Sequence, residues 1–269
     1  MSRAFTTLLL TALLLPPTPS EVVAADSIDD CIAATYKIVN KDSTATCFVV
    51  VRGKDPILVT AAHVLEQMSG DVSVIVLRAK AADGRFARHE VPLSIRSDGK
   101  PRWVRHAEVD VAAMPLTLRD DAPIAAIDFD QLADASAIEE GKLRTAEEVW
   151  MPCYPAQLES NRAGFPILRR GTVASFPLLP PKHEDTYLVD YRTFGGDSGA
   201  PVIVHRHKAE AGEDKKDARP LVVGLVIGKH RETTRSVTPI EERTVHRSLG
   251  LGIVVHAEFI RQTIAKLPR

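Results

Sequence analysis

A glycine-rich turn with a central serine lies between two apolar segments in the second half of the chain. The sequence FGGDSGAP occupies residues 194–201, with apolar runs at 186–191 and 202–204 on either side. A serine hydroxyl is a poor nucleophile at neutral pH, and it needs a base to accept its proton and donors to hold the oxyanion that forms. Glycines beside a serine let neighbouring N–H groups face one point. Ser198 is therefore a candidate nucleophile, although a plain hairpin connection has a similar composition.

Two upstream segments supply the partners that such a serine needs. His63 follows an apolar run and two alanines in ILVTAAHVL, residues 57–65. Asp110 interrupts the apolar run EVDVAAMPL, residues 108–116, and a buried carboxylate costs several kcal/mol unless it is hydrogen-bonded or paired. Taken singly, each residue also suits a packed histidine at a strand end or an aspartate in a turn. The nucleophile turn of α/β-hydrolases is disfavoured, because its last glycine is replaced by Ala200.

Taken together, the motifs TAAH, DVA and GDSGAP resemble those of the trypsin/chymotrypsin-like serine proteases, in the same order. The spacings of 47 residues (63 to 110) and 88 residues (110 to 198) are typical of that family, and the resemblance covers roughly residues 33–265. It implies an all-β fold of two six-stranded antiparallel β-barrels with a C-terminal helix. It also implies that His63 is the general base, Asp110 orients it and Ser198 attacks. The N–H groups of Gly196 and Ser198 would form the oxyanion hole, and no metal or other cofactor is required.

The first 25 residues have the pattern of a secretory signal peptide. Arg3 gives the positive start, an apolar core follows, and Val23-Ala24-Ala25 supplies small residues for cleavage. About 12 apolar residues are too few to span a bilayer, so we expect no membrane association after cleavage. The protein is predicted to be secreted or periplasmic, in a bacterium. Its 34 basic and 35 acidic residues give a net charge of −1, which argues against nucleic-acid binding; the oligomeric state is not predicted.

The remaining chain is predicted to form an N-terminal barrel over 26–120, a connection over 121–147 and a C-terminal barrel over 148–269. Short β-branched and apolar runs indicate the strands, the last of them over 221–227 and 249–255. A short helix is expected within the connection, over 129–140. Apolar residues spaced by three and four from Ala257 to Leu267 predict the C-terminal helix.

Three cysteines, Cys31, Cys47 and Cys153, could form one disulfide bond in an oxidising compartment. The family's common bridge beside the histidine is unavailable, because Val64 occupies the expected partner position. In relatives the segments of Cys47 and Cys153 flank the oxyanion loop, so the resemblance favours that pair if a bridge forms.

Asp197 matches the family motif, but the partner that this acid has in digestive relatives is missing from the sequence. In digestive relatives this acid pairs with a new N-terminus made by zymogen cleavage, and the region near Asp26 lacks the Ile-Val-Gly-Gly start. Zymogen activation is therefore not indicated, and the sequence does not identify the partner of Asp197.

Substrate specificity is predicted from the residue six positions before the nucleophile, where the family has the base of its primary pocket. Arg192 stands there, and residues 226–229, including Ile227 and Lys229, would form the opposite wall. A basic pocket favours acidic side chains at the cleaved residue. Alternatively, Arg192 turns outward or neutralises Asp190 or Asp197.

The resulting hypothesis is a secreted endopeptidase that acts on polypeptide substrates through an acyl-enzyme. A non-catalytic relative that binds peptides or proteins is the alternative from another class, and labelling of the active serine separates the two. An esterase on the same triad is the third hypothesis, and comparison of amide with ester substrates tests it.

Overall fold

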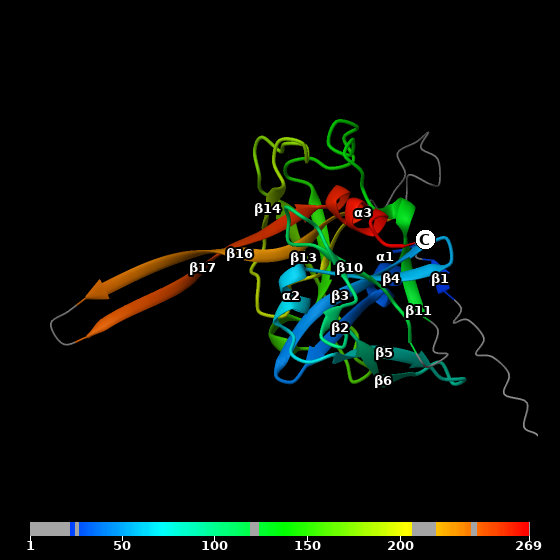
Figure 1. Ribbon diagram of the computed structural model, residues 1–269. Coiled ribbons are helices and arrows are strands. Elements are labelled where there is room, and N and C mark those ends of the chain that lie inside the picture. The colour runs from blue at the N-terminus through cyan, green and yellow to red at the C-terminus, as the bar shows by residue number, and fades with distance from the viewer. Residues whose placement is uncertain (1–21, 25–26, 119–123, 206–218, 238–240, 269) are drawn as a thin grey trace, which may run out of the picture.

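The computed structural model describes residues 22–24, 27–118, 124–205, 219–237 and 241–268, and it consists mainly of β-strands (Figure 1). The predicted leader therefore lies almost entirely outside the described residues. Most strands of the first half form a nine-stranded sheet of order β6-β5-β2-β3-β4-β10-β9, with β11 pairing in parallel with both β3 and β1. These strands are β1 (Val22–Ala24), β2 (Thr35–Asn40), β3 (Ser43–Arg52), β4 (Asp55–Thr60), β5 (Val72–Lys80), β6 (Phe86–Ser94), β9 (Val104–Arg105), β10 (Ala112–Pro115) and β11 (Ile124–Asp128).

The position of each strand in this sheet follows from its apolar pattern. β3 is buried continuously from residue 45 to residue 51, because it lies between other strands and is covered on both faces. β6 forms the edge and is mostly exposed, with only Val91 and Leu93 buried. Such an edge tolerates the charged residues that the centre of the sheet excludes. Within the described residues the hydrogen-bonded path from β6 to β9 does not close on itself.

The second half forms a closed antiparallel barrel of order β12-β13-β14-β17-β16-β15, which β15 closes by pairing with β12. Its strands are β12 (Glu148–Cys153), β13 (Ile167–Val173), β14 (Thr186–Asp190), β15 (Pro201–Val204), β16 (Leu221–Val237) and β17 (Glu242–His256). A final helix, α3 (Ala257–Ala265), packs against β10 and β16. The predicted all-β fold of the chymotrypsin type with a C-terminal helix is thus confirmed.

The remaining elements are short. They are α1 (Ile28–Ala33), α2 (Ala62–Gln67), the two-stranded sheet of β7 (Arg96–Ser97) and β8 (Lys100–Pro101), and the 3-10 turns η1 (Phe129–Gln131) and η2 (Pro155–Gln157). The helix expected over 129–140 is reduced to η1, because the chain becomes extended at Leu132, where it forms a β-bridge with Val222. No helix among the described residues has the length and apolar character needed to cross a membrane.

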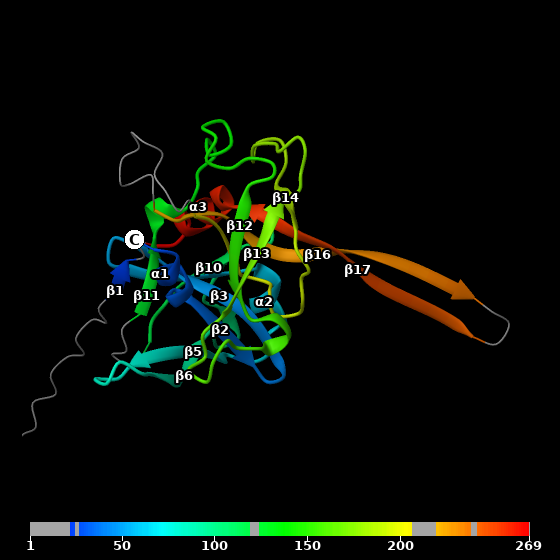
Figure 2. The ribbon, with the colours of Figure 1, turned by 180° about the vertical axis from the view of Figure 1, so that it is seen from behind.

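Strands β16 and β17 continue far beyond the barrel. The sequence pattern predicted that they end at 227 and begin at 249, but β16 runs to Val237 and β17 starts at Glu242. We call residues 229–237 and 242–250 the ribbon. Figures 1 and 2 show it projecting from the body of the molecule. The register shifts twice between Val226 and Arg231, so the bulges that free the ribbon from the barrel lie at its base.

The three cysteines are free and buried, so the predicted Cys47–Cys153 disulfide bond is not formed. The Cys47 thiol donates to the Tyr36 carbonyl oxygen of the neighbouring strand at 3.5 Å. The Cys153 thiol lies 3.9 Å from the Ile167 carbonyl oxygen, in the other barrel. Each side chain is thus directed into the interior of its own half of the molecule. Burial raises the pKa of the Cys31 thiol to about 12, which keeps it protonated and unreactive.

His256, which precedes α3, gives the first testable prediction. Its side chain is buried beside the Tyr187 ring, with 4.8 Å between ring centroids, and burial lowers its pKa from 6.5 to about 4. Protonation therefore favours the unfolded state, so this group's effect on stability is negligible above pH 6.5 and destabilising as the pH falls from 6.5 towards 4. Between pH 7 and pH 5 the native protein should lose about 2 kcal/mol more unfolding free energy than His256→Phe. Urea unfolding at both pH values measures this difference, and equal losses in the two proteins would contradict it.

Candidate active site

His63 and Asp110 form a doubly hydrogen-bonded pair. β4 ends at Thr60, and the fully buried Ala61 and Ala62 allow α2 to start immediately, which places His63 in its first turn. The Asp110 carboxylate accepts the His63 backbone N–H at 2.8 Å and faces the ring nitrogen Nδ1 at 2.5 Å. Burial alone would raise the pKa of Asp110, but these hydrogen bonds outweigh it and hold the pKa below its usual value. The pair fixes the ring and leaves its Nε2 nitrogen for a reacting group.

His106 holds the loop that carries Asp110. It is buried, and its Nδ1 accepts the N–H groups of Glu108 and Val109 at 3.2 and 3.4 Å. Its Nε2 can therefore donate to the Gln262 side-chain oxygen in α3, at 3.0 Å. The C-terminal helix thus supports the Asp110 loop, a contact that the sequence pattern did not reveal.

The glycines of the Ser198 turn are required by close backbone contacts. Gly196 has φ +98° and Gly199 has φ +88°, values that L-residues rarely adopt. A Cβ atom on Gly196 would lie 2.2 Å from the Tyr154 carbonyl oxygen, and one on Gly199 would lie 2.0 Å from that of Thr46. The Thr46 hydroxyl donates to the Gly196 carbonyl oxygen at 2.7 Å. The backbone N–H of Thr46 donates to the Ser198 carbonyl oxygen at 3.0 Å. The turn is thus clamped to β3.

This clamping orients the peptide groups around the nucleophile. Within the described residues, the N–H groups of Gly196 and Ser198 have no protein acceptor, whereas those of Asp197, Gly199 and Ala200 donate to carbonyl oxygens. Two free donors beside a serine are suited to bind a negatively charged oxygen. Within the described residues, no hydrogen bond joins the Ser198 hydroxyl to the His63 ring. In active sites without substrate, the distance between the nucleophile and its base is often too long for such a bond.

Arg169 is the partner of Asp197 that the sequence did not identify. The Asp197 carboxylate is almost fully buried, and it accepts the Phe194 N–H at 2.8 Å and the Arg169 guanidinium at 3.2 Å. Burial raises the pKa of Asp197, while the Phe194 N–H and Arg169 counteract this effect. Arg169 comes from β13, and its guanidinium also lies 5.2 Å from the ring centroids of Tyr191 and Phe194. The acid is therefore anchored by a side chain of the second barrel.

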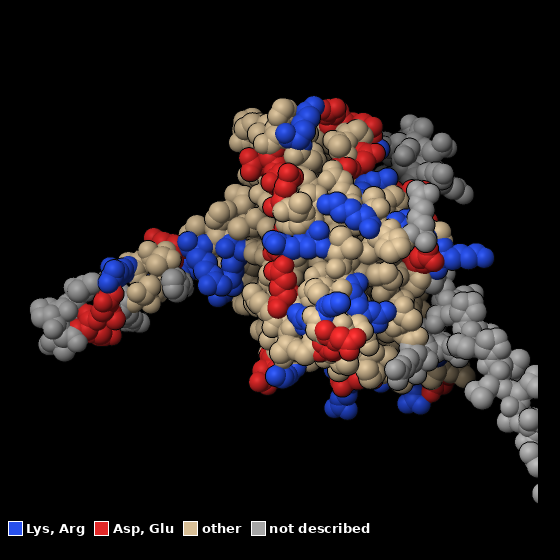
Figure 3. Space-filling model, in the orientation of Figure 1, with Lys and Arg blue, Asp and Glu red and all other residues tan. Residues whose placement is uncertain are grey.

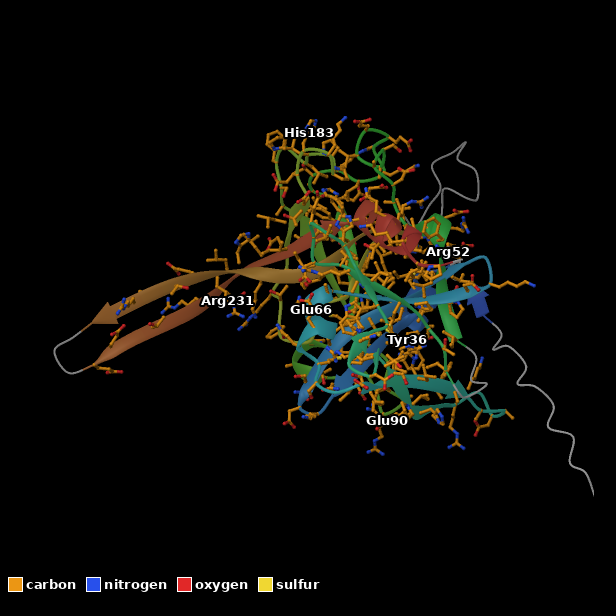
Figure 4. The ribbon with its side chains drawn as sticks, viewed as in Figure 1. Tyr36, Arg52, Glu66, Glu90, His183 and Arg231 are labelled. Atoms are coloured by element: carbon orange, nitrogen blue, oxygen red, sulfur yellow. The ribbon has the colours of Figure 1, made fainter. Side chains whose placement is uncertain are left out.

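Two cavities meet at Ser198 and His63. The larger, of about 720 Å³, extends between α2, the start of β3 and the loop of η2. The smaller, of about 310 Å³, lies between residues 193–195 and residues 226–229 of β16. Arg231 lines both cavities, and Figure 4 shows it where the ribbon leaves the barrel. The two cavities leave open space on either side of Ser198.

Of the three residues predicted to determine substrate specificity, only two lie in the smaller cavity. Ile227 and Lys229 line the smaller cavity as expected, whereas Arg192 lies outside it and is exposed. Side chains of an extended segment alternate, and here Tyr191 and Thr193 face inward, so Arg192 points outward. Its guanidinium lies 5.2 Å from the Phe194 ring centroid. Arg192 therefore does not form the base of the cavity; its side chain points outward, which is the alternative considered from the sequence.

The glycine geometry gives a second prediction. Gly196→Ala should reduce kcat by about 10²–10³-fold, the effect of losing one oxyanion donor, because the new methyl group displaces the turn from the Tyr154 carbonyl oxygen. Gly195→Ala is the matched control, since a Cβ there meets nothing within 4 Å. Steady-state hydrolysis of an activated ester measures both variants. Similar activity of the two would show that the Gly196 N–H is not used.

The sequence matches a known family model. The family model described as the trypsin-like peptidase domain matches residues 45–209, which is more than half of the chain. The protein therefore belongs to the trypsin-like peptidase family, and its class is that of a serine protease. No curated protein matches the chain.

Two crystal structures of Rv3671c from M. tuberculosis are similar to it, both in an inactive form. The first, a serine-to-alanine mutant, has 18% identity and a TM-score of 0.45, covering 89% of this chain and 88% of that chain. The second, described as a protease, has 17% identity and a TM-score of 0.44, covering 92% and 99%.

Proposed function

We propose that the protein is a secreted serine endopeptidase that cleaves polypeptides through an acyl-enzyme on Ser198. One observation carries the proposal. The Ser198 hydroxyl, the His63 ring held by Asp110, and the two N–H groups without a protein acceptor belong to residues that line the larger cavity, and His63 and Ser198 also line the smaller one. This combination supplies nucleophile, base and oxyanion donors at one point.

Each group has a defined part in the reaction. His63 Nε2 accepts the Ser198 proton as the hydroxyl oxygen attacks the substrate carbonyl carbon. Asp110 holds the ring in the required tautomer and stabilises the imidazolium. The N–H groups of Gly196 and Ser198 bind the oxyanion. His63 then gives its proton to the leaving amine, and water hydrolyses the acyl-enzyme by the same steps.

The proposal also holds that the Ser198 turn has its active conformation without zymogen cleavage. Asp197 already has a cation, Arg169, and a backbone donor, Phe194, so it does not depend on a newly formed N-terminus. The proposal also includes export, based on the signal pattern of residues 1–25. Cleavage after residue 25 would remove β1, a three-residue strand whose one pairing partner among the described residues is β11.

A fluorophosphonate probe tests the proposal directly, because it phosphonylates only an activated serine. We expect stoichiometric labelling of the full chain, with the label mapped by peptide analysis to Ser198. Asp110→Asn should still fold but should react far more slowly, because the amide favours the wrong tautomer of His63. No labelling of the native protein would favour a non-catalytic peptide-binding protein. Labelling with hydrolysis of esters but not of peptides would favour an esterase.

A further inference from the structure

The smaller cavity beside Ser198 carries more positive than negative charge, because Lys229 and Arg231 line it together with one acid, Asp197. Lys229 is half-buried there, and its ammonium group donates to the Thr193 carbonyl oxygen at 3.2 Å. Arg231 is exposed at the mouth. Within the described residues neither side chain forms an ion pair. Figure 3 shows Lys and Arg side chains gathered where the ribbon leaves the barrel.

The acidic groups around the cavity are already committed. Among the described residues, Asp197 is the one acid that lines it; its carboxylate accepts hydrogen bonds from Arg169 and the Phe194 N–H and also interacts electrostatically with Lys229. On the ribbon, Glu232 lies opposite Arg247 in the strand register, and Arg235 pairs with Glu242. Because Arg169 is already the ion-pair partner of Asp197, Lys229 and Arg231 leave the cavity with a net positive charge that a ligand can use.

A neutral donor in the same cavity also lacks a partner. Thr193 is 3% exposed and lines the cavity, and its hydroxyl has no hydrogen-bond partner among the described residues. A buried hydroxyl without a partner costs free energy, which a bound acceptor would recover. A carboxylate can accept hydrogen bonds from the hydroxyl, the ammonium and the guanidinium groups at once.

We propose that this cavity binds the side-chain carboxylate of a glutamate or aspartate whose own carbonyl carbon is attacked by Ser198. The protein then cleaves polypeptides after acidic residues, with Thr193, Lys229 and Arg231 as the specificity-determining residues in place of Arg192. This inference rests on the proposed endopeptidase function. A volume of about 310 Å³ is roughly that of ten water molecules, which is enough for such a side chain.

Two peptides that differ only in Glu or Gln at the cleaved residue test the proposal. We expect kcat/KM to be at least tenfold higher for the Glu peptide, and to fall with added salt. Lys229→Gln and Arg231→Gln should each reduce this ratio roughly tenfold, the size of a lost charge-assisted hydrogen bond, and Thr193→Val should reduce it less. Arg192→Gln is the matched control, because it removes the same charge outside the cavity.

A variant with a new substrate preference cannot be explained by unfolding, so it provides a second test. Lys229→Glu should reverse the preference, so that peptides with Lys at the cleaved residue become the better substrates. The fluorophosphonate labelling rate of each variant reports whether its site is intact, independently of the peptide used. An unchanged Glu/Gln ratio in correctly labelled Lys229 and Arg231 variants would overturn the proposal, as would a native preference for basic or small apolar residues.

Failure of the proposed function has a different signature. If the native protein is neither labelled nor active, the endopeptidase proposal fails, and the cavity can still be tested by binding. Fluorescence anisotropy with the Ser198→Ala protein then compares labelled peptides that end in Glu or in Gln. Tighter binding of the Glu peptide supports the carboxylate site, and equal dissociation constants overturn it.

Discussion

Replacing Ser198 with alanine is expected to reduce peptide hydrolysis about 10⁶-fold while leaving the fold unchanged. Among the described residues, Ser198 is the one hydroxyl-bearing residue that lines both cavities together with His63. Its loss leaves only binding and oxyanion stabilisation, which contribute a small residual rate. Hydrolysis of a peptide substrate and thermal unfolding of the same sample measure the two parts of this result.

Ser160→Ala is the matched control for that experiment. Ser160 is exposed and its hydroxyl bonds only to the Phe165 carbonyl oxygen, at 3.3 Å. Its replacement should leave hydrolysis within a few-fold of the native rate. A Ser198→Ala protein that retains a tenth of the native activity would show that another residue is the nucleophile.

The short motifs around Ser198 and His63 allowed the site to be predicted, because close packing there permits only a few residue types. Gly196 and Gly199 cannot carry a side chain where the turn meets Tyr154 and Thr46. Likewise, Ala61 and Ala62 are fully buried where α2 begins. Such contacts leave a local pattern that can be recognised from one sequence. The all-β fold was predicted from the family resemblance that these motifs carry, and the C-terminal helix also from the apolar periodicity of its sequence.

Other features depend on tertiary register and could not be predicted. A buried Asp197 requires a cation, but 34 lysines and arginines were available, and only the pairing of β13 with β12 selects Arg169. Arg192 was assigned by counting back from Ser198, whereas the alternation of the extended chain turns it outward. The ribbon has a mixed polar sequence, which does not distinguish a projecting hairpin from a loop.

Arg169→Met is expected to destabilise the protein by about 3–5 kcal/mol and to abolish most of its activity. Methionine keeps an apolar stem beside Tyr191 and Phe194 but leaves Asp197 buried without its cation. The same carboxylate holds the Phe194 N–H at the start of the catalytic turn, so its displacement should move the oxyanion donors as well. Urea unfolding and ester hydrolysis measure the two effects.

Arg170→Met provides the control on the neighbouring residue. Arg170 forms only a solvent-exposed pair with Glu148, 3.3 Å apart, and exposed pairs contribute about 0–1 kcal/mol. Its replacement should therefore change neither stability nor hydrolysis appreciably. Equal effects of the two substitutions would mean that the Arg169–Asp197 pair does not support the turn.

The dependence on pH distinguishes a lost charge partner from lost packing. Removing Arg169 takes away an interaction that lowers the pKa of Asp197, so that pKa, already raised by burial, should rise further. A protonated Asp197 needs no cation. The stability deficit of Arg169→Met relative to the native protein should therefore shrink as the pH falls through the raised pKa. Asp197→Asn in the Arg169→Met background should likewise recover stability at neutral pH. A deficit that stays constant with pH, and that asparagine does not relieve, would attribute the effect to packing of the arginine stem instead.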